Sequence, residues 1–215
     1  MSSLRHHSLL DHVISQFDSM ILALGRTDVS PLKASPAQRY PLVAPTEELA
    51  ATSRRFLCHD HLDQISSVAL YRGRCLAASS AEQRSQLAQQ ATQGFDRLLW
   101  CRSRLSELDG RTSRLVPLAY MGSLGAGVLA QTVGHAQAEA LASAQAHAAH
   151  KRLEGQLELL RNQDRRSHAV IERLSEQENQ RAYNSMEKGR HEVALPLRLG
   201  ARCADKLLGR LVERI

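Results

Sequence analysis

Apolar residues recur at helical spacing along most of the chain, whereas no alternating apolar and polar stretch of useful length occurs. The pattern predicts an all-α protein, built as a bundle of four long helices with additional N- and C-terminal helices. The expected long helices cover residues 46–78, 81–108, 115–160 and 165–188. Shorter amphipathic helices are expected over residues 8–24, which Gly25 ends, and over residues 195–213.

Proline residues mark the boundary of the bundle. Four of the six prolines lie within residues 26–45, which predicts an extended linker there. Thr46 is a suitable N-cap for the first bundle helix, and Glu47 and Glu48 place negative charge in its first turn. We therefore expect an N-terminal helix and proline-rich linker over residues 1–45, followed by a helical bundle domain over residues 46–215.

The composition supports helices and limits the partners. Aromatic residues make up only 4% of the 215 residues, and helix-forming residue types dominate. The formal net charge of +6 suits an anionic partner such as membrane lipid. Nucleic acid is not expected, because no basic run is interleaved with aromatic residues. Scattered cysteines and the lack of a signal peptide predict reduced thiols in the cytosol, at Cys58, Cys75, Cys101 and Cys203.

The segment of residues 115–138 carries no charged side chain when His135 is counted as neutral. That length is sufficient to span a membrane, but Pro117 and four glycines dilute its hydrophobicity. Two interpretations remain open. The segment is either a helix at the membrane surface with one apolar face toward lipid, or an ordinary core helix.

Several short motifs, in their order and spacing, resemble one known family over nearly the full length of the chain. They are Arg5-His6-His7-Ser8, Leu70-Tyr71-Arg72-Gly73, Leu99-Trp100-Cys101, Pro117-Leu118-Ala119-Tyr120 with the glycines that follow, Lys151-Arg152-Leu153 and Arg214-Ile215. The family is that of the bacterial demethoxyubiquinone hydroxylases, which are ferritin-like di-iron monooxygenases of ubiquinone biosynthesis. The resemblance implies a ferritin-like bundle, two iron ions, a prenylated quinone as ligand, and peripheral attachment to the cytoplasmic face of the inner membrane.

The resemblance also assigns six iron-ligand positions. In such bundles two helices each supply a Glu-x-x-His pair, and the other two helices each supply one glutamate. The six positions fall on Gln64, Gly94, Arg97, Ala146, Glu178 and Arg181. Only Glu178 is of the ligand type that the family requires. Arginine cannot replace histidine as a ligand, because its guanidinium stays protonated and offers no lone pair.

The charges at these positions form a consistent set. Four carboxylates and two neutral histidines would carry −4, which two ferrous ions neutralise. Here Arg97, Glu178 and Arg181 sum to +1 without metal. We therefore expect Glu178 to pair with Arg97 or with Arg181, and we expect no cofactor.

Two further sets of residues have both a functional and an ordinary interpretation. A displaced site for a metal of the zinc type is the functional interpretation of the first set, since its four side chains are predicted at one height in the bundle: Asp60, His61, Cys101 and His150. A quinone channel is the functional interpretation of a second set: Leu118, Tyr120, Met121, Leu124 and Val128. In the ordinary interpretation both sets are core or surface residues of a helical bundle.

The sequence supports three hypotheses of function. The first hypothesis is a metal-free, non-catalytic member of the hydroxylase family, a quinone-binding or scaffold protein at the membrane. Its partners would be other ubiquinone-biosynthesis proteins, in a homo- or hetero-oligomer. The second is an active hydroxylase with a relocated or altered metal site. The third is a structural helical protein unrelated to quinones.

Overall fold

The computed structural model describes residue 31 and residues 33–160 and 163–188, with side chains through residue 184. A short 3-10 helix, η1 (Pro36–Arg39), precedes five α-helices. Their bounds are α2 (Glu47–Ala77), α3 (Ala81–Glu107), α4 (Val116–Val133), α5 (His135–Leu160) and α6 (Arg165–Lys188). No strand occurs among these residues, which confirms the all-α prediction. The helices expected at residues 8–24 and 195–213 lie outside the described residues.

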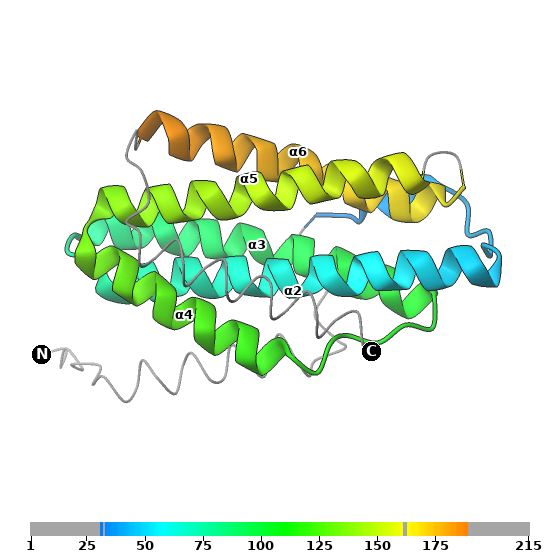
Figure 1. Cartoon of the computed structure of the whole chain (residues 1–215), viewed down its shortest axis with the longest axis horizontal. Coiled ribbons are helices and arrows are strands. Elements are labelled where there is room, and N and C mark those ends of the chain that lie inside the picture. Colours follow the sequence, from blue (N-terminus) through cyan, green and yellow to red (C-terminus); the bar gives the residue numbers. More distant parts are fainter. Residues whose placement is uncertain (1–30, 32, 161–162, 189–215) are drawn as a thin grey trace, which may run out of the picture. The chain divides into compact units, whose positions relative to one another are not determined.

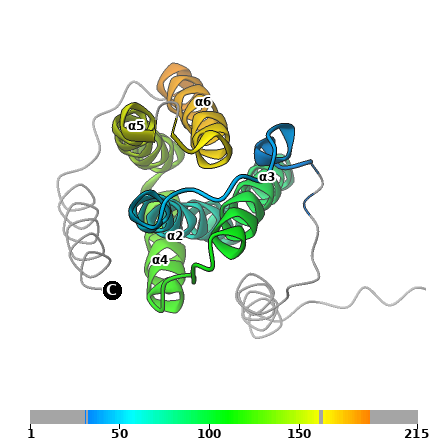
Figure 2. The same cartoon turned by 90° about the vertical axis from the view of Figure 1, so that its right-hand side faces the viewer.

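Four of the helices form the bundle. The antiparallel pair α2 and α3 packs beside the antiparallel pair α5 and α6, and α4 lies along the outer side of α2 (Figures 1 and 2). The side chain of Ser80 caps α3 by accepting a hydrogen bond from the Gln83 amide (3.1 Å). Thr46 stands at the N-cap of α2 as expected, but its side chain makes no capping hydrogen bond.

A break at Gly134 corrects the prediction of one continuous helix over residues 115–160. Gly134 has φ 151° and ψ 149°, a conformation that only glycine adopts without strain, and it separates α4 from α5. The break turns the chain, so that α4 packs against α2 instead of extending the bundle helix (Figure 1).

The contact between α2 and α4 depends on two glycines. A Cβ atom on Gly73 would overlap the carbonyl oxygen of Leu124, and a Cβ atom on Gly127 would overlap the carbonyl oxygen of Leu70. Each helix therefore offers a glycine to the backbone of the other, and the two backbones approach closely. Beside this contact the buried guanidinium of Arg74 of α2 pairs with Glu139 of α5 and donates a hydrogen bond to Gln131 of α4, which links α4 to the bundle.

Replacing Gly127 with alanine is expected to reduce the free energy of unfolding by about 2–3 kcal/mol, because the two backbones must move apart. Gly125 on the same helix is the matched control. A Cβ atom there meets nothing within 4 Å, so Gly125→Ala should stabilise the protein by about 1 kcal/mol through helix propensity. Urea unfolding measures both variants. Equal stability of the two would contradict the close approach of α2 and α4.

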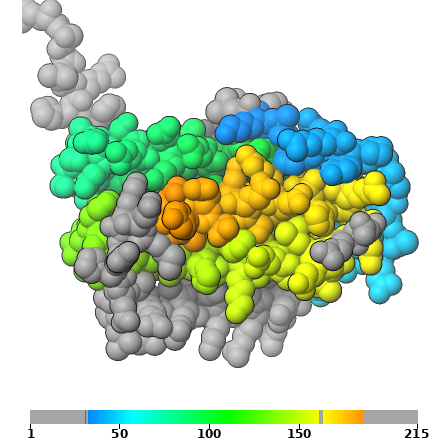
Figure 3. All heavy atoms as spheres, turned by 90° about the horizontal axis from the view of Figure 1, so that it is seen from above, coloured from blue at the N-terminus to red at the C-terminus, as the bar shows by residue number. Residues whose placement is uncertain are grey.

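The linker is partly folded onto the bundle. Within the expected extended segment, η1 forms a helical turn that lies beside α6 (Figure 3). The Lys33 carbonyl accepts a hydrogen bond from the indole Nε1 of Trp100 (2.9 Å), and the Tyr40 carbonyl accepts one from Arg166 Nη1 (2.6 Å). The domain boundary at residue 45 stays a prediction.

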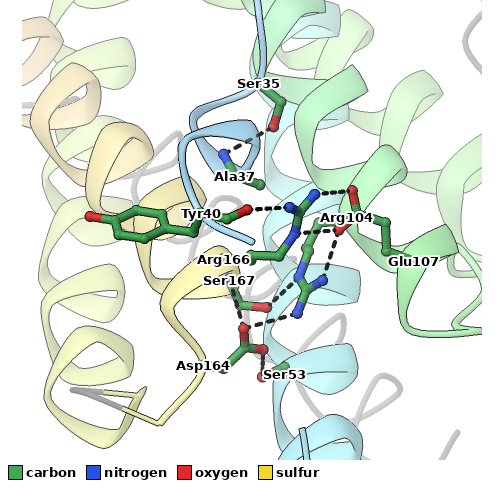
Figure 4. Close-up of polar contacts among 9 residues, drawn as sticks. All are labelled: Ser35, Ala37, Tyr40, Ser53, Arg104, Glu107, Asp164, Arg166 and Ser167. Atoms are coloured by element: carbon green, nitrogen blue, oxygen red, sulfur yellow. Dashed lines mark hydrogen bonds and ion pairs between the residues drawn. The ribbon is translucent and has the colours of Figure 1, made fainter. Parts of the chain in front are cut away.

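A cluster of polar and charged side chains connects α3 to the start of α6 (Figure 4). Arg104 of α3 is buried, and it donates to Asp164 Oδ1 (2.9 Å) and Ser167 Oγ (2.9 Å) at the start of α6. Glu107 accepts hydrogen bonds from both Arg104 and Arg166. The guanidinium groups lower the pKa of Glu107 against the raising effect of burial. Every charged group in this cluster has a partner, so we assign the cluster to stability.

Candidate functional site

Three bundle helices bring four of the six assigned positions together in the core. Gln64 of α2 donates from Nε2 to Glu178 Oε1 of α6 (3.1 Å) and accepts from Arg97 Nε of α3 (2.7 Å). Arg181, one turn beyond Glu178, donates from Nη1 to both carboxylate oxygens (2.7 Å each). These four side chains are called the Glu178 network. The ion pair expected between Glu178 and Arg181 is confirmed, and Arg97 reaches the carboxylate through Gln64.

The charged side chains of the Glu178 network are ionised at neutral pH. Glu178 is only 2% exposed, and burial by itself raises its pKa. Arg181 and Arg97, together with the hydrogen bond from Gln64, outweigh burial and leave the pKa of Glu178 below its usual value. Burial and the neighbouring Arg181 lower the pKa of Arg97 to about 10, so this guanidinium stays protonated at neutral pH. The network therefore carries one carboxylate and two cations.

Tyr71 supports Arg181 from the side of α2. The Arg181 guanidinium lies over the buried Tyr71 ring, 5.1 Å from its centroid, which adds a cation–π attraction. Burial lowers the pKa of Arg181, but Glu178 and Tyr71 raise it by more, so the net shift is upward. Arg181 thus has both an anionic partner and an aromatic surface in place.

The remaining two assigned positions carry small residues. Val68 packs closely against Gly94: a Cβ atom on Gly94 would lie 2.5 Å from Val68 Cγ2. Ala146 is buried. The site therefore contains one carboxylate, one amide and two guanidinium groups. A carboxylate-bridged pair of iron ions needs carboxylate and imidazole ligands, so these residues do not fit such a centre.

Among the described residues, the four side chains of the expected displaced metal site do not meet as a group of metal ligands. Asp60, His61 and Cys101 are buried, whereas His150 faces Ser175, whose Oγ lies 2.8 Å from His150 Nδ1. Burial, with a smaller contribution from Arg102, lowers the pKa of His61 to about 4, so the ring is neutral. Burial raises the pKa of Cys101 well above its usual value, which leaves a neutral thiol in the core.

A different group of metal-ligand side chains lies one turn before Gln64. His59, Asp60 and Asp63 each offer a ligand atom within 4.8 Å of the other two, and they form the one such group among the described residues. The sequence prediction included only Asp60 of this trio. The i, i+4 spacing of His59 and Asp63 was the available signal, because it places both on one face of α2.

The expected quinone-channel residues occupy different faces of α4. Leu118 and Met121 are exposed, whereas Tyr120 is buried and its hydroxyl accepts a hydrogen bond from Arg72 (3.1 Å). Leu124 and Val128 are half-buried. The five side chains therefore do not share one side of the helix.

The outer face of α4 is apolar. Leu118 is 64% exposed, and three further large apolar residues are exposed on this helix: Met121, Leu129 and Val133. Among the described residues, α4 is the one helix long and apolar enough to cross a membrane, and a third of it is buried in the protein. Spanning helices, helices on a lipid surface and helices that pack against a partner share this length and composition.

Two antiparallel helix pairs packed side by side form the four-helix bundle of a ferritin-like protein. The charged residues of the Glu178 network lie on its axis, where the resemblance places the iron ligands. The chain belongs to the family of the ubiquinone biosynthesis protein COQ7, whose model matches residues 51–201. Membership places it in ubiquinone biosynthesis and confirms the resemblance seen in the sequence.

Full-length relatives agree with this assignment. The 3-demethoxyubiquinol 3-hydroxylase of Pseudomonas putida (strain W619) is 30% identical over 219 residues that cover both chains completely. The enzyme of the same name from Chromohalobacter salexigens is 31% identical over 208 residues, which are 97% of this chain and 98% of the relative. No solved structure matches the chain.

Proposed function

We propose that this protein is a non-catalytic member of the COQ7 family, with a metal-free bundle core, that binds prenylated quinone or serves as a scaffold in ubiquinone biosynthesis. The observation that carries the proposal is the Glu178 network. It places two arginines and a glutamine around the one carboxylate at the assigned iron-ligand positions. The partners in this role are membrane lipid or quinone and other proteins of the same pathway.

The electrostatics of the network oppose iron. An entering ferrous ion would meet two protonated guanidinium groups, Arg97 and Arg181, and would compete with them for Glu178. Four empty carboxylates would repel one another in a buried site, whereas this set is hydrogen-bonded without metal. In this proposal the ligand residues at the five other assigned positions have been replaced together, and the new side chains stabilise a bundle without iron.

The outer face of α4 and the net charge support a membrane location. Exposed apolar side chains on α4 favour contact with lipid, and a formal net charge of +6 favours an anionic surface. We place the protein as a peripheral protein at the cytoplasmic face of the inner membrane. Its oligomeric partners would be further copies of the chain or an active relative.

The test is to purify the full chain from iron-replete cells and to measure its metal content and its organic-extractable lipid. The hydroxylase of Pseudomonas putida (strain W619), prepared identically, is the control for iron loading. We expect far less than one iron per chain, together with co-purified ubiquinone-like lipid. Near-stoichiometric iron would overturn the proposal and favour an active hydroxylase. Absence of both iron and quinone would contradict quinone binding and favour a purely structural role.

A further inference from the structure

A second cluster of ionisable side chains lies on α2, one turn away from the Glu178 network. His59 and Asp63 are four residues apart, with His59 Nδ1 3.6 Å from Asp63 Oδ2, and Asp60 lies beside them. One ligand atom from each residue falls within 4.8 Å of the other two. An imidazole nitrogen and two carboxylate oxygens are donors that zinc and similar divalent ions accept.

The carboxylate of Asp60 is buried with an unused acceptor. Asp60 is 1% exposed, and its Oδ1 accepts a hydrogen bond from Gln156 Nε2 (3.1 Å). Its Oδ2 is also buried and finds no hydrogen-bond partner among the described residues. A buried carboxylate oxygen without a donor is costly, so a missing partner is indicated. Gln156 fixes the orientation of the carboxylate and leaves Oδ2 available to that partner.

Arg152 of α5 provides the positive charge that faces the carboxylates of Asp60 and Asp63. Its guanidinium pairs with Asp63, and its Nε lies 4.0 Å from Asp60 Oδ1. With the His59 ring neutral, as metal binding requires, a single guanidinium leaves the two carboxylates with one uncompensated negative charge, whereas a divalent ion would neutralise both. The Arg152 side chain is 28% exposed although its Nε and Nη2 atoms are buried, so the guanidinium would have to turn outward to admit an ion.

We propose that His59, Asp60 and Asp63 form a binding site for a divalent ion of the zinc class, with Arg152 as the internal cation that the ion displaces. The side chains of His59 and Asp63 are 21% and 22% exposed, but the facing atoms His59 Nδ1 and Asp63 Oδ2 are buried, so a bound ion would lie beneath the surface. A water molecule would complete its coordination. None of the three residues is at an assigned iron-ligand position. The site therefore shares no residue with the Glu178 network.

The test is titration of the metal-stripped full-length protein with Zn²⁺ by calorimetry, and with Co²⁺, whose visible absorption reports its ligands. We expect one ion per chain. His59→Gln and Asp63→Asn should each weaken binding by at least about tenfold. Arg152→Gln should strengthen binding by a similar factor, because it removes the competing charge. A change in this direction is not expected from damage to the fold, which circular dichroism monitors in every variant.

Two controls separate this site from others. His147→Gln removes an exposed histidine from α5 and should leave the affinity unchanged. Binding that is unaffected by Asp63→Asn, or weakened by Arg152→Gln, would overturn the proposal. Binding lost in Glu178→Gln but kept in Asp63→Asn would place the ion in the Glu178 network, which would contradict the proposed metal-free core as well. Binding at the His59 site leaves the proposed metal-free core intact.

Discussion

Replacing Glu178 with alanine is expected to lower the free energy of unfolding by about 3–5 kcal/mol. The substitution leaves Arg181 and Arg97 buried near one another without their carboxylate, and it leaves the amide of Gln64 without its acceptor. Equilibrium unfolding in urea, followed by circular dichroism, measures the loss. The size of the effect comes from the uncompensated charges more than from the attraction itself.

The same helix provides a matched control. Glu176 pairs with Arg173 at the same i, i+3 spacing and the same 2.7 Å distance, but these side chains are 58% and 49% exposed. Glu176→Ala should therefore change stability by less than about 1 kcal/mol. A loss at Glu178 no greater than the loss at Glu176 would show that the Glu178 network is not buried as described.

A triple variant tests the cause of this loss. Glu178→Leu combined with Arg97→Met and Arg181→Met removes all three charges and fills the space with apolar side chains. Buried ion pairs replaced in this way often lose little stability. The triple variant should therefore be more stable than Glu178→Ala alone. A triple variant as unstable as the single one would mean that the loss comes from packing or from the unpaired amide of Gln64, and not from charge.

The sequence was sufficient to predict contacts between residues that are neighbours on one helix. Glu178 and Arg181 are three residues apart, so their pairing followed from helical geometry. The long helices followed from apolar periodicity, except where Gly134 required a positive φ that the periodicity does not show. Several glycines in this segment gave no means of choosing which of them would break the helix.

Contacts between helices were harder to foresee. The role of Gln64 as a bridge between Arg97 and Glu178 depends on how three helices approach one another. Arg152 reaches the carboxylates of α2 from α5, and no local pattern encodes that meeting. Family resemblance indicated which positions face the bundle axis, but the hydrogen bonds among their new side chains required the packed structure.

Restoring the family's ligand set is the second experiment with a large expected effect. The required substitutions are Gln64→Glu, Gly94→Glu, Arg97→His, Ala146→Glu and Arg181→His. At position 94 the structure shows an obstacle, because a Cβ atom would lie 2.5 Å from Val68 Cγ2. The short, branched side chain of Val68 cannot turn away easily. We therefore expect the five substitutions to yield iron binding only when Val68→Ala is added.

The measurement is iron content per chain after anaerobic reconstitution with ferrous ion and removal of loosely bound metal. The six-substitution variant should approach two ions per chain, the number that a carboxylate-bridged site holds. The five-substitution variant should hold much less, and Val68→Ala alone should hold none, because Arg97 and Arg181 still occupy the core. Equal iron in the five- and six-substitution variants would show that Val68 is no obstacle. No iron in either would mean that the residues surrounding the ligands no longer orient them, so that the change from the family's chemistry extends beyond the six assigned positions.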